Sequence, residues 1–125
     1  LQQLDLPDGL DAIVTVQNYH DLYLKPFPAG TAAKVDAELF KSLKPGGVLL
    51  VVDHAALPGS GISAADSLHR IDPAAVKSDL KAAGFVLERE SPLLADAADP
   101  HTASVFDPAI RGKTDQFVLV FRKPR

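Results

Sequence analysis

Two continuous apolar runs constrain this chain most. They are "AIVTV" at 12–16 and "GVLLVV" at 47–52, and neither alternates with polar residues. A strand with one face in water alternates, whereas an unbroken apolar run is typical of a parallel strand covered on both faces. We therefore predict parallel strands over 11–17 and 47–54, joined by a right-handed crossover through a helix.

Caps and turns place the other elements between and after these strands. Thr31 can cap a helix that closes at "KPGG", and Asp72 can cap a second helix that has Pro73 in its first turn. The remaining predicted elements are helices over 31–43 and 73–83, strands over 85–91 and 115–124, and a long polar loop over 91–114. This order predicts an α/β sheet whose last strand is antiparallel.

Composition excludes several classes of partner. The formal net charge of -3 provides no basic surface for nucleic acid, so we predict no nucleic-acid partner. No window approaches the roughly 18 uninterrupted apolar residues of a membrane span, so we predict no membrane association. The absence of cysteine fits a reducing compartment, and we expect a cytoplasmic protein. Because the chain lacks methionine even at position 1, we also expect that residues preceded Leu1.

Polar residues follow both apolar runs at the point where each strand should end. "NYHD" comes directly after the first strand, and Asp53 and His54 close the second. Ligands of open α/β sheets bind at the carboxyl ends of parallel strands, so the two groups would lie side by side at a site. The alternative is that Asn and Asp cap turns while Tyr and His cover the sheet edge. Both interpretations stay open.

A metal site is not predicted from the spacing of the possible ligands. The side chains that could bind an ion are His20, Asp21, Asp53, His54 and His69. No H-x-x-x-H or H-x-H pair occurs among them, and scattered histidines are more often hydrogen-bonded loop residues. We therefore expect no metal.

The segment "GSGISA" at 59–64 has the G-x-G-x-x-A form of a dinucleotide fingerprint. In that fingerprint the first glycine follows the strand at once, whereas here the residues 53–58 intervene. A flexible loop is the better interpretation.

Several segments together resemble one enzyme family. They are "DAIVTVQNYHDLY", "LKPGGVLLVVDH", "HRID", "LKAAGF" and "RGKTDQFVLVFRKP". In combination they are similar to the C-terminal half of a class I S-adenosylmethionine-dependent methyltransferase, in particular the bacterial predicted methyltransferases. The resemblance implies a partial, doubly wound Rossmann-like sheet with an antiparallel C-terminal strand, and residues 1–125 as the C-terminal portion of that domain.

The same resemblance implies a cofactor and a site. S-adenosylmethionine would be the methyl donor and a small molecule the acceptor. The implied roles are donor binding by Asn18 and Tyr19, acceptor binding by Asp53, His54 and His69, and catalysis by His20 as a general base with Asp21 as its partner. The glycine-rich donor loop of the family has no counterpart here and is expected before Leu1.

The competing hypothesis is a non-catalytic α/β module that binds a partner protein. In the resembled fold the strand 11–17 has a neighbour on each side, but these residues supply only one, so an unpaired edge is expected. Both helices should cover one face, which would leave Val14, Val16, Leu49 and Val51 bare on the other. We therefore expect a homodimer, or association with the missing N-terminal half.

Overall fold

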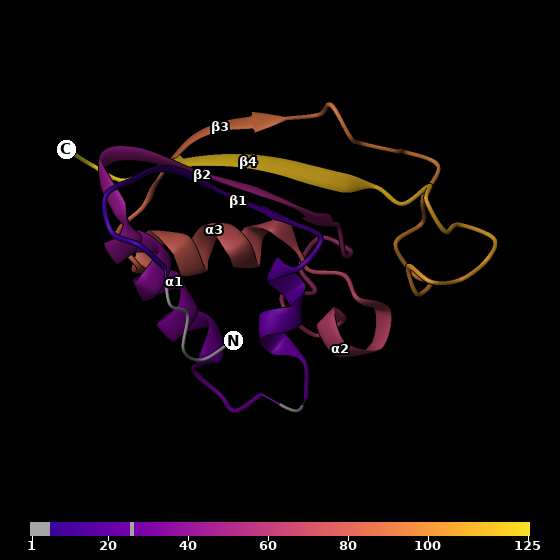
Figure 1. The fold of residues 1–125 in the computed structure, drawn as a ribbon. Helices are drawn as coiled ribbons and strands as arrows, with labels where there is room; N and C mark the ends of the chain where they lie inside the picture. The colour runs from indigo at the N-terminus through magenta and orange to yellow at the C-terminus, as the bar shows by residue number, and fades with distance from the viewer. Residues whose placement is uncertain (1–5, 26) are drawn as a thin grey trace.

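A four-stranded mixed sheet organises the molecule (Figure 1). The computed structural model describes residues 6–25 and 27–125. The strands are β1 (Leu10–Val16), β2 (Leu43–His54), β3 (Val86–Ser91) and β4 (Gln116–Arg122), in the order β1-β2-β4-β3. β1 and β2 are parallel, while β4 lies antiparallel between β2 and β3. The predicted α/β fold with an antiparallel C-terminal strand is confirmed.

The helices lie together on one face of this sheet (Figure 1). They are the 3-10 helix η1 (Tyr19–Tyr23) and the α-helices α1 (Thr31–Ser42), α2 (Ala65–Leu68) and α3 (Pro73–Ala82). The sequence did not predict η1 or α2, because each is too short to show a periodic apolar pattern. Over residues 6–25 and 27–125, no helix is long and apolar enough to cross a membrane.

The two predicted helix caps have different outcomes. The Asp72 carboxylate caps α3 by accepting a hydrogen bond from the Ala74 N–H at 3.0 Å. The prediction for Thr31 is wrong, because Gly30 occupies the cap position of α1 in a left-handed conformation, with φ of 90°. The Thr31 hydroxyl instead donates to the Pro28 carbonyl at 2.7 Å.

The second strand begins earlier than predicted. α1 ends at Ser42, and the "KPGG" segment belongs to β2, whose first residue Leu43 pairs with Leu10 of β1. A side chain at Gly47 would bring its Cβ to 2.9 Å from the Lys44 carbonyl oxygen. The glycine therefore allows the close backbone approach at the irregularity in β2, where the pairing with β1 shifts between Leu43 and Val48.

The core lies between the sheet and the helices. Leu49 and Val51 have no exposed surface, and they pack in one cluster with the fully buried Val76 and Leu80 of α3. The prediction that Leu49 and Val51 lie on the bare face is therefore wrong. The parallel register explains the error, because Val14 pairs with Leu50 rather than with Leu49 or Val51, and paired residues point to the same face.

Among the described residues, no helix lies on the opposite face of the sheet (Figure 1). Val14 and Val16 of β1 are 60% and 49% exposed there, as predicted for these two residues. The prediction that β1 is covered on both faces is wrong for the described residues, because Val14 and Val16 are exposed on this face. The predicted unpaired edge of β1 is confirmed for the same residues, since β1 ends the strand order β1-β2-β4-β3. An apolar edge strand beside a bare face is a surface that favours association.

A buried ion pair fixes the long loop between β3 and β4. The Arg70 guanidinium donates to both oxygens of Asp99 at 2.6 and 2.9 Å, and neither side chain is exposed. The remaining Arg70 hydrogen bonds reach the carbonyls of Ala55 and Ala103, both at 2.9 Å. Although burial opposes ionisation, the hydrogen bonds from Arg70 and nearby N–H groups lower the pKa of Asp99 to about 2. The loop is thus held against the carboxyl end of β2.

Candidate functional site

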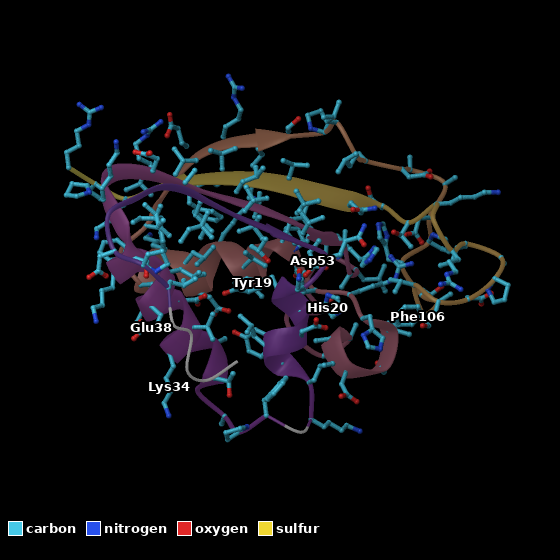
Figure 2. All side chains as sticks on the ribbon, in the orientation of Figure 1. Tyr19, His20, Lys34, Glu38, Asp53 and Phe106 are labelled. Carbon is cyan, nitrogen blue, oxygen red and sulfur yellow. The ribbon has the colours of Figure 1, made fainter. Side chains whose placement is uncertain are left out.

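A buried histidine links the ends of the two parallel strands. The chain leaves β1 at Gln17, whose N–H still bonds to the Val52 carbonyl at 2.7 Å, and η1 follows at once. η1 places His20 beneath the end of β2 (Figure 2), where its N–H donates to Asp53 Oδ2 at 2.7 Å. The imidazole Nδ1 lies 2.8 Å from Asp53 Oδ1. His20 is therefore held by both its backbone and its ring.

The surroundings of Asp53 determine which nitrogen of His20 carries a proton. Asp53 is fully buried, and it also accepts a hydrogen bond from the His54 N–H at 2.8 Å. A carboxylate can only accept hydrogen bonds, so Nδ1 must donate to it. In a neutral imidazole the proton on Nδ1 leaves a lone pair on Nε2. This is the arrangement of a general base or of a metal ligand.

The Nε2 atom of His20 faces two further side chains. Asp21 Oδ1 lies 3.1 Å from it, and His69 Nδ1 lies 3.3 Å from it. The His20 side chain is 4% exposed, whereas the Asp21 side chain is 36% exposed. The cluster is therefore closed on the Asp53 side and open on the Asp21 side.

Backbone pairing brings His69 into this cluster from a distant part of the sequence. The N–H of Ile71 bonds to the His54 carbonyl at 3.0 Å, which continues the sheet beyond β2. The Asp66 carboxylate of α2 accepts from the Lys25 N–H at 2.9 Å, so α2 is tied to the end of η1. His69 itself has a left-handed backbone with φ of 57°, a conformation uncommon for residues other than glycine.

His54 and Phe106 complete the rim of the cluster. Nδ1 of His54 lies 2.6 Å from the hydroxyl of Thr114, and its ring centroid is 6.2 Å from that of His20. Burial lowers the pKa of His54 below its usual value, so this ring favours the neutral form. Phe106 of the long loop stacks edge-on against His69 at 4.9 Å, near the end of α2 (Figure 2).

Tyr19 points away from the cluster, toward the helices. Its hydroxyl donates to Asp36 of α1 at 2.9 Å and lies 3.4 Å from Asp79 of α3. Tyr23 donates to the same Asp79 carboxylate. Burial, opposed by the Tyr19 hydrogen bond and assisted by the charge on Asp79, raises the pKa of Asp36 to about 7. Burial likewise raises the pKa of Tyr19 and Tyr23, so both stay protonated donors.

A shallow apolar hollow lies beside β1. Asn18 is exposed at its rim, and Tyr19 contributes to its wall. The other lining residues are Leu6, Ile13, Val14, Thr15, Leu22, Val35 and Leu39. The hollow thus opens on the side of β1 where residues 6–25 and 27–125 supply no neighbouring strand.

Solved structures identify the fold. The chain superposes on an N-methyltransferase, NodS from Bradyrhizobium japonicum WM9, with TM-score 0.65 and 16% identity, covering 99% of this chain and 56% of that one. For a SAM-dependent methyltransferase from Aquifex aeolicus the TM-score is 0.60 with 17% identity, covering 98% and 50%. The chain has a Rossmann-like methyltransferase fold.

The same methyltransferase fold occurs in a protein with another activity. The [4+2]-cyclase SpnF superposes with TM-score 0.67 and 20% identity, covering 98% of this chain and 53% of that one. No family model and no curated protein matches the sequence. The chain spans about half the length of these three structures. At such identities the likeness shows the fold alone.

Within this methyltransferase fold, most of the predicted site residues come together. His20, Asp21 and His69 meet at Nε2 of His20, and Asp53 and His54 lie directly beneath and beside them. Two residues lie differently from what their predicted roles require. The hydroxyl of Tyr19, predicted to bind the donor, is directed at Asp36, and Asp53, predicted to bind the acceptor, has no exposed surface. The roles of all these residues stay predictions.

Sequence reasoning missed Asp36, Thr114 and Phe106. Asp36 had one detectable signal, because it falls at a core position of α1 between Val35 and Leu39, where an acid is unexpected. Thr114 and Phe106 lie in the long loop and show no periodic pattern. Only tertiary contacts could have identified them.

The raised pKa of Asp36 predicts how stability depends on pH. An unfolded aspartate titrates near 3.8, whereas Asp36 in the folded chain titrates near 7. Between these values the folded state binds more protons, so the free energy of unfolding should fall as pH rises, by up to about 1.4 kcal/mol per pH unit. Asp36→Asn should flatten this fall and stabilise the chain at pH 8, as measured by urea unfolding between pH 4 and 8.

Glu38→Gln on the same helix is the matched control, because Glu38 lies on the outer side of α1 (Figure 2). It should leave the slope unchanged. An Asp36→Asn chain whose stability still falls by the wild-type amount between pH 4 and 7 would contradict the assignment.

Proposed function

We propose that this chain is the acceptor-binding portion of a methyltransferase that uses S-adenosylmethionine and acts on a small molecule. The proposal rests on one observation: a hydrogen bond to the Asp53 carboxylate holds the His20 imidazole at the carboxyl ends of two parallel strands. In an α/β sheet this is the place where ligands bind. The likeness to solved methyltransferases supports this class of reaction.

The donor would lie along the open side of β1. Asn18 at the rim of the hollow and the backbone of Tyr19 are the proposed contacts, because the Tyr19 hydroxyl is already bonded to Asp36. When bound, S-adenosylmethionine supplies a methyl carbon on a positively charged sulfur, which an acceptor lone pair attacks in line. We infer that the glycine-rich part of the donor site lies outside these residues.

The acceptor would lie against the open side of the histidine cluster. His20 and Asp21, whose Nε2 and Oδ1 atoms lie 3.1 Å apart, are the proposed catalytic pair, and the acceptor atom would approach Nε2 from the Asp21 side. His54 and His69 line the acceptor side, whereas Asp53 acts through His20 because it is fully buried. Catalysis would then depend on holding donor and acceptor in line, with the His20 lone pair activating the acceptor.

Replacing His20 tests this proposal. In a protein that contains these residues and transfers methyl groups, His20→Ala should lower kcat by about 10²–10⁴-fold. The dissociation constant for S-adenosylmethionine should change little, because the donor contacts are Asn18 and Tyr19. Single-turnover rates with radiolabelled donor, together with calorimetry of donor binding, measure the two effects separately.

His101→Ala is the control, because His101 is also paired with an aspartate, Asp115, at 2.8 Å but lies outside the cluster. It should keep the wild-type rate. A His20→Ala protein with an unchanged single-turnover rate would refute the catalytic role.

The bare face of the sheet favours a second candidate function, a non-catalytic module that binds a partner. Val14, Val16 and Val86 are 60%, 49% and 55% exposed, although such side chains are usually buried. Burying them stabilises an association by about 25 cal/mol per Å² of apolar area. Under the methyltransferase proposal, a second copy or the remainder of the fold covers this face.

We predict that the 125-residue chain self-associates through β1 and the bare face. Val14→Thr with Val16→Thr keeps the shape of both side chains and makes them polar, so it should weaken the association at least about tenfold. Light scattering over a concentration series measures this. Leu93→Ser is the control, because Leu93 is 81% exposed on the long loop. A wild-type chain that stays a folded monomer at all concentrations would contradict the prediction.

A further inference from the structure

We propose that His20, His69 and Asp21 form a binding site for a divalent transition-metal ion. The ligand atoms are Nε2 of His20, Nδ1 of His69 and a carboxylate oxygen of Asp21, which all lie within 4.8 Å of one another. The spacing of these residues in the sequence predicted no metal. Their convergence is a consequence of the fold, because His69 reaches the cluster through α2 and the pairing of Ile71 with β2.

The distances between the ligand atoms fit a metal ion. Nitrogen and oxygen ligands lie about 2.0–2.1 Å from Zn²⁺, which places two ligands of a tetrahedral site about 3.3 Å apart. Nε2 of His20 lies 3.3 Å from Nδ1 of His69 and 3.1 Å from Oδ1 of Asp21. The two distances from Nε2 of His20 therefore match a tetrahedral site, while the ligand atoms of His69 and Asp21 lie within 4.8 Å of each other.

The charges in the cluster also favour a cation at its centre. Because Nδ1 of His20 donates to Asp53, the neutral ring presents a lone pair at Nε2. His69 can supply one proton toward that lone pair, but the Asp21 carboxylate cannot supply any. Two electron-rich atoms, on His20 and Asp21, thus face each other at 3.1 Å. A bound metal ion converts this repulsion into attraction, as a proton on Nε2 also would, so an ion would compete with a proton for this position.

Asp53 has the position of a residue that supports a metal ligand. Histidines that bind metals almost always donate their other N–H to a carboxylate or carbonyl, which fixes the tautomer and makes the ligating nitrogen more basic. Asp53 performs this role for His20 at 2.8 Å. Its second oxygen is held by the His20 N–H, so the carboxylate cannot rotate away.

The ligand types select the kind of ion. Two imidazole nitrogens with one carboxylate oxygen suit Zn²⁺, Co²⁺, Ni²⁺, Mn²⁺ or Fe²⁺, whereas Ca²⁺ and Mg²⁺ prefer ligand sets made of oxygen. Three protein ligands leave a further position for water or for a ligand oxygen. That position would lie on the open side of the cluster, because His20 is buried and Asp21 is partly exposed.

The metal site and the proposed methyl transfer use the same lone pair, that on Nε2 of His20. With an ion bound, Nε2 is a ligand and no longer the general base, and the open position would hold an acceptor atom in its place. A binding experiment tests the metal site without any measurement of activity.

The direct test is to titrate the metal-free chain with Zn²⁺ in a buffer free of chelators and to measure the heat of binding by calorimetry. We expect one ion per chain. Co²⁺ as a second probe should give the visible absorption of a low-coordinate site with nitrogen and oxygen ligands. Histidine ring resonances of His20 and His69 should shift on binding, while that of His101 should not.

Substitutions identify the ligands. His69→Asn removes the imidazole but introduces a residue that also tolerates the left-handed backbone. It should weaken Zn²⁺ binding at least about 100-fold. His101→Asn is the matched control, because His101 has the same backbone region, with φ of 65°, but lies outside the cluster. It should bind as the wild type does. Asp53→Asn, which removes the support and not a ligand, should weaken binding about 10–100-fold.

Three results would overturn the proposal. One is a wild-type chain that binds no Zn²⁺ or Co²⁺ at millimolar concentration. Another is equal binding by the His69→Asn and His101→Asn chains, which would place the ion elsewhere. The third is a folded Asp21→Asn chain, verified by circular dichroism, whose affinity for Zn²⁺ equals that of the wild type.

Discussion

The buried Asp53 carboxylate is the interaction on which the whole site depends. It has no exposed surface, and it lies at the end of β2, where its oxygens accept hydrogen bonds from the backbone and ring of His20 and from the His54 N–H. These bonds satisfy a charge that would otherwise be costly to bury. They also fix the position of η1 and the tautomer of His20. The position of His20 in the cluster therefore follows from one carboxylate at a strand end.

The elements of the fold could be predicted where one segment alone carried the signal. The apolar runs of β1 and β2 indicated parallel strands, and Asp72 before Pro73 indicated the start of α3. Details that depend on two segments could not be predicted in this way. Whether Leu49 or Leu50 faces the helices follows from the pairing of β1 with β2. Likewise, "KPGG" joined β2 because Leu43 pairs with Leu10.

The site residues, too, could be predicted where one segment indicated them and not where the contact joins distant segments. Polar residues after two parallel strands predicted that His20 and Asp53 would be neighbours, since the strand ends meet at one edge of the sheet. The residue pattern alone did not place His69 beside His20, because that contact depends on the short helix α2 and on an isolated pairing beyond β2. The family resemblance did name His69 as a site residue, in an acceptor-binding role that stays a prediction. The direction of the Tyr19 side chain toward Asp36 depends on the packing of η1 against α1.

The central claim is that Asp53 holds the His20 imidazole with its proton on Nδ1 and its lone pair on Nε2. Long-range ¹H–¹⁵N correlation spectra of the histidine rings measure this tautomer directly in the metal-free chain. We predict that the neutral form of His20 carries its proton on Nδ1, and that Asp53→Asn reduces this preference. A neutral His20 with its proton on Nε2 would contradict both the proposed activation of an acceptor and the proposed metal site.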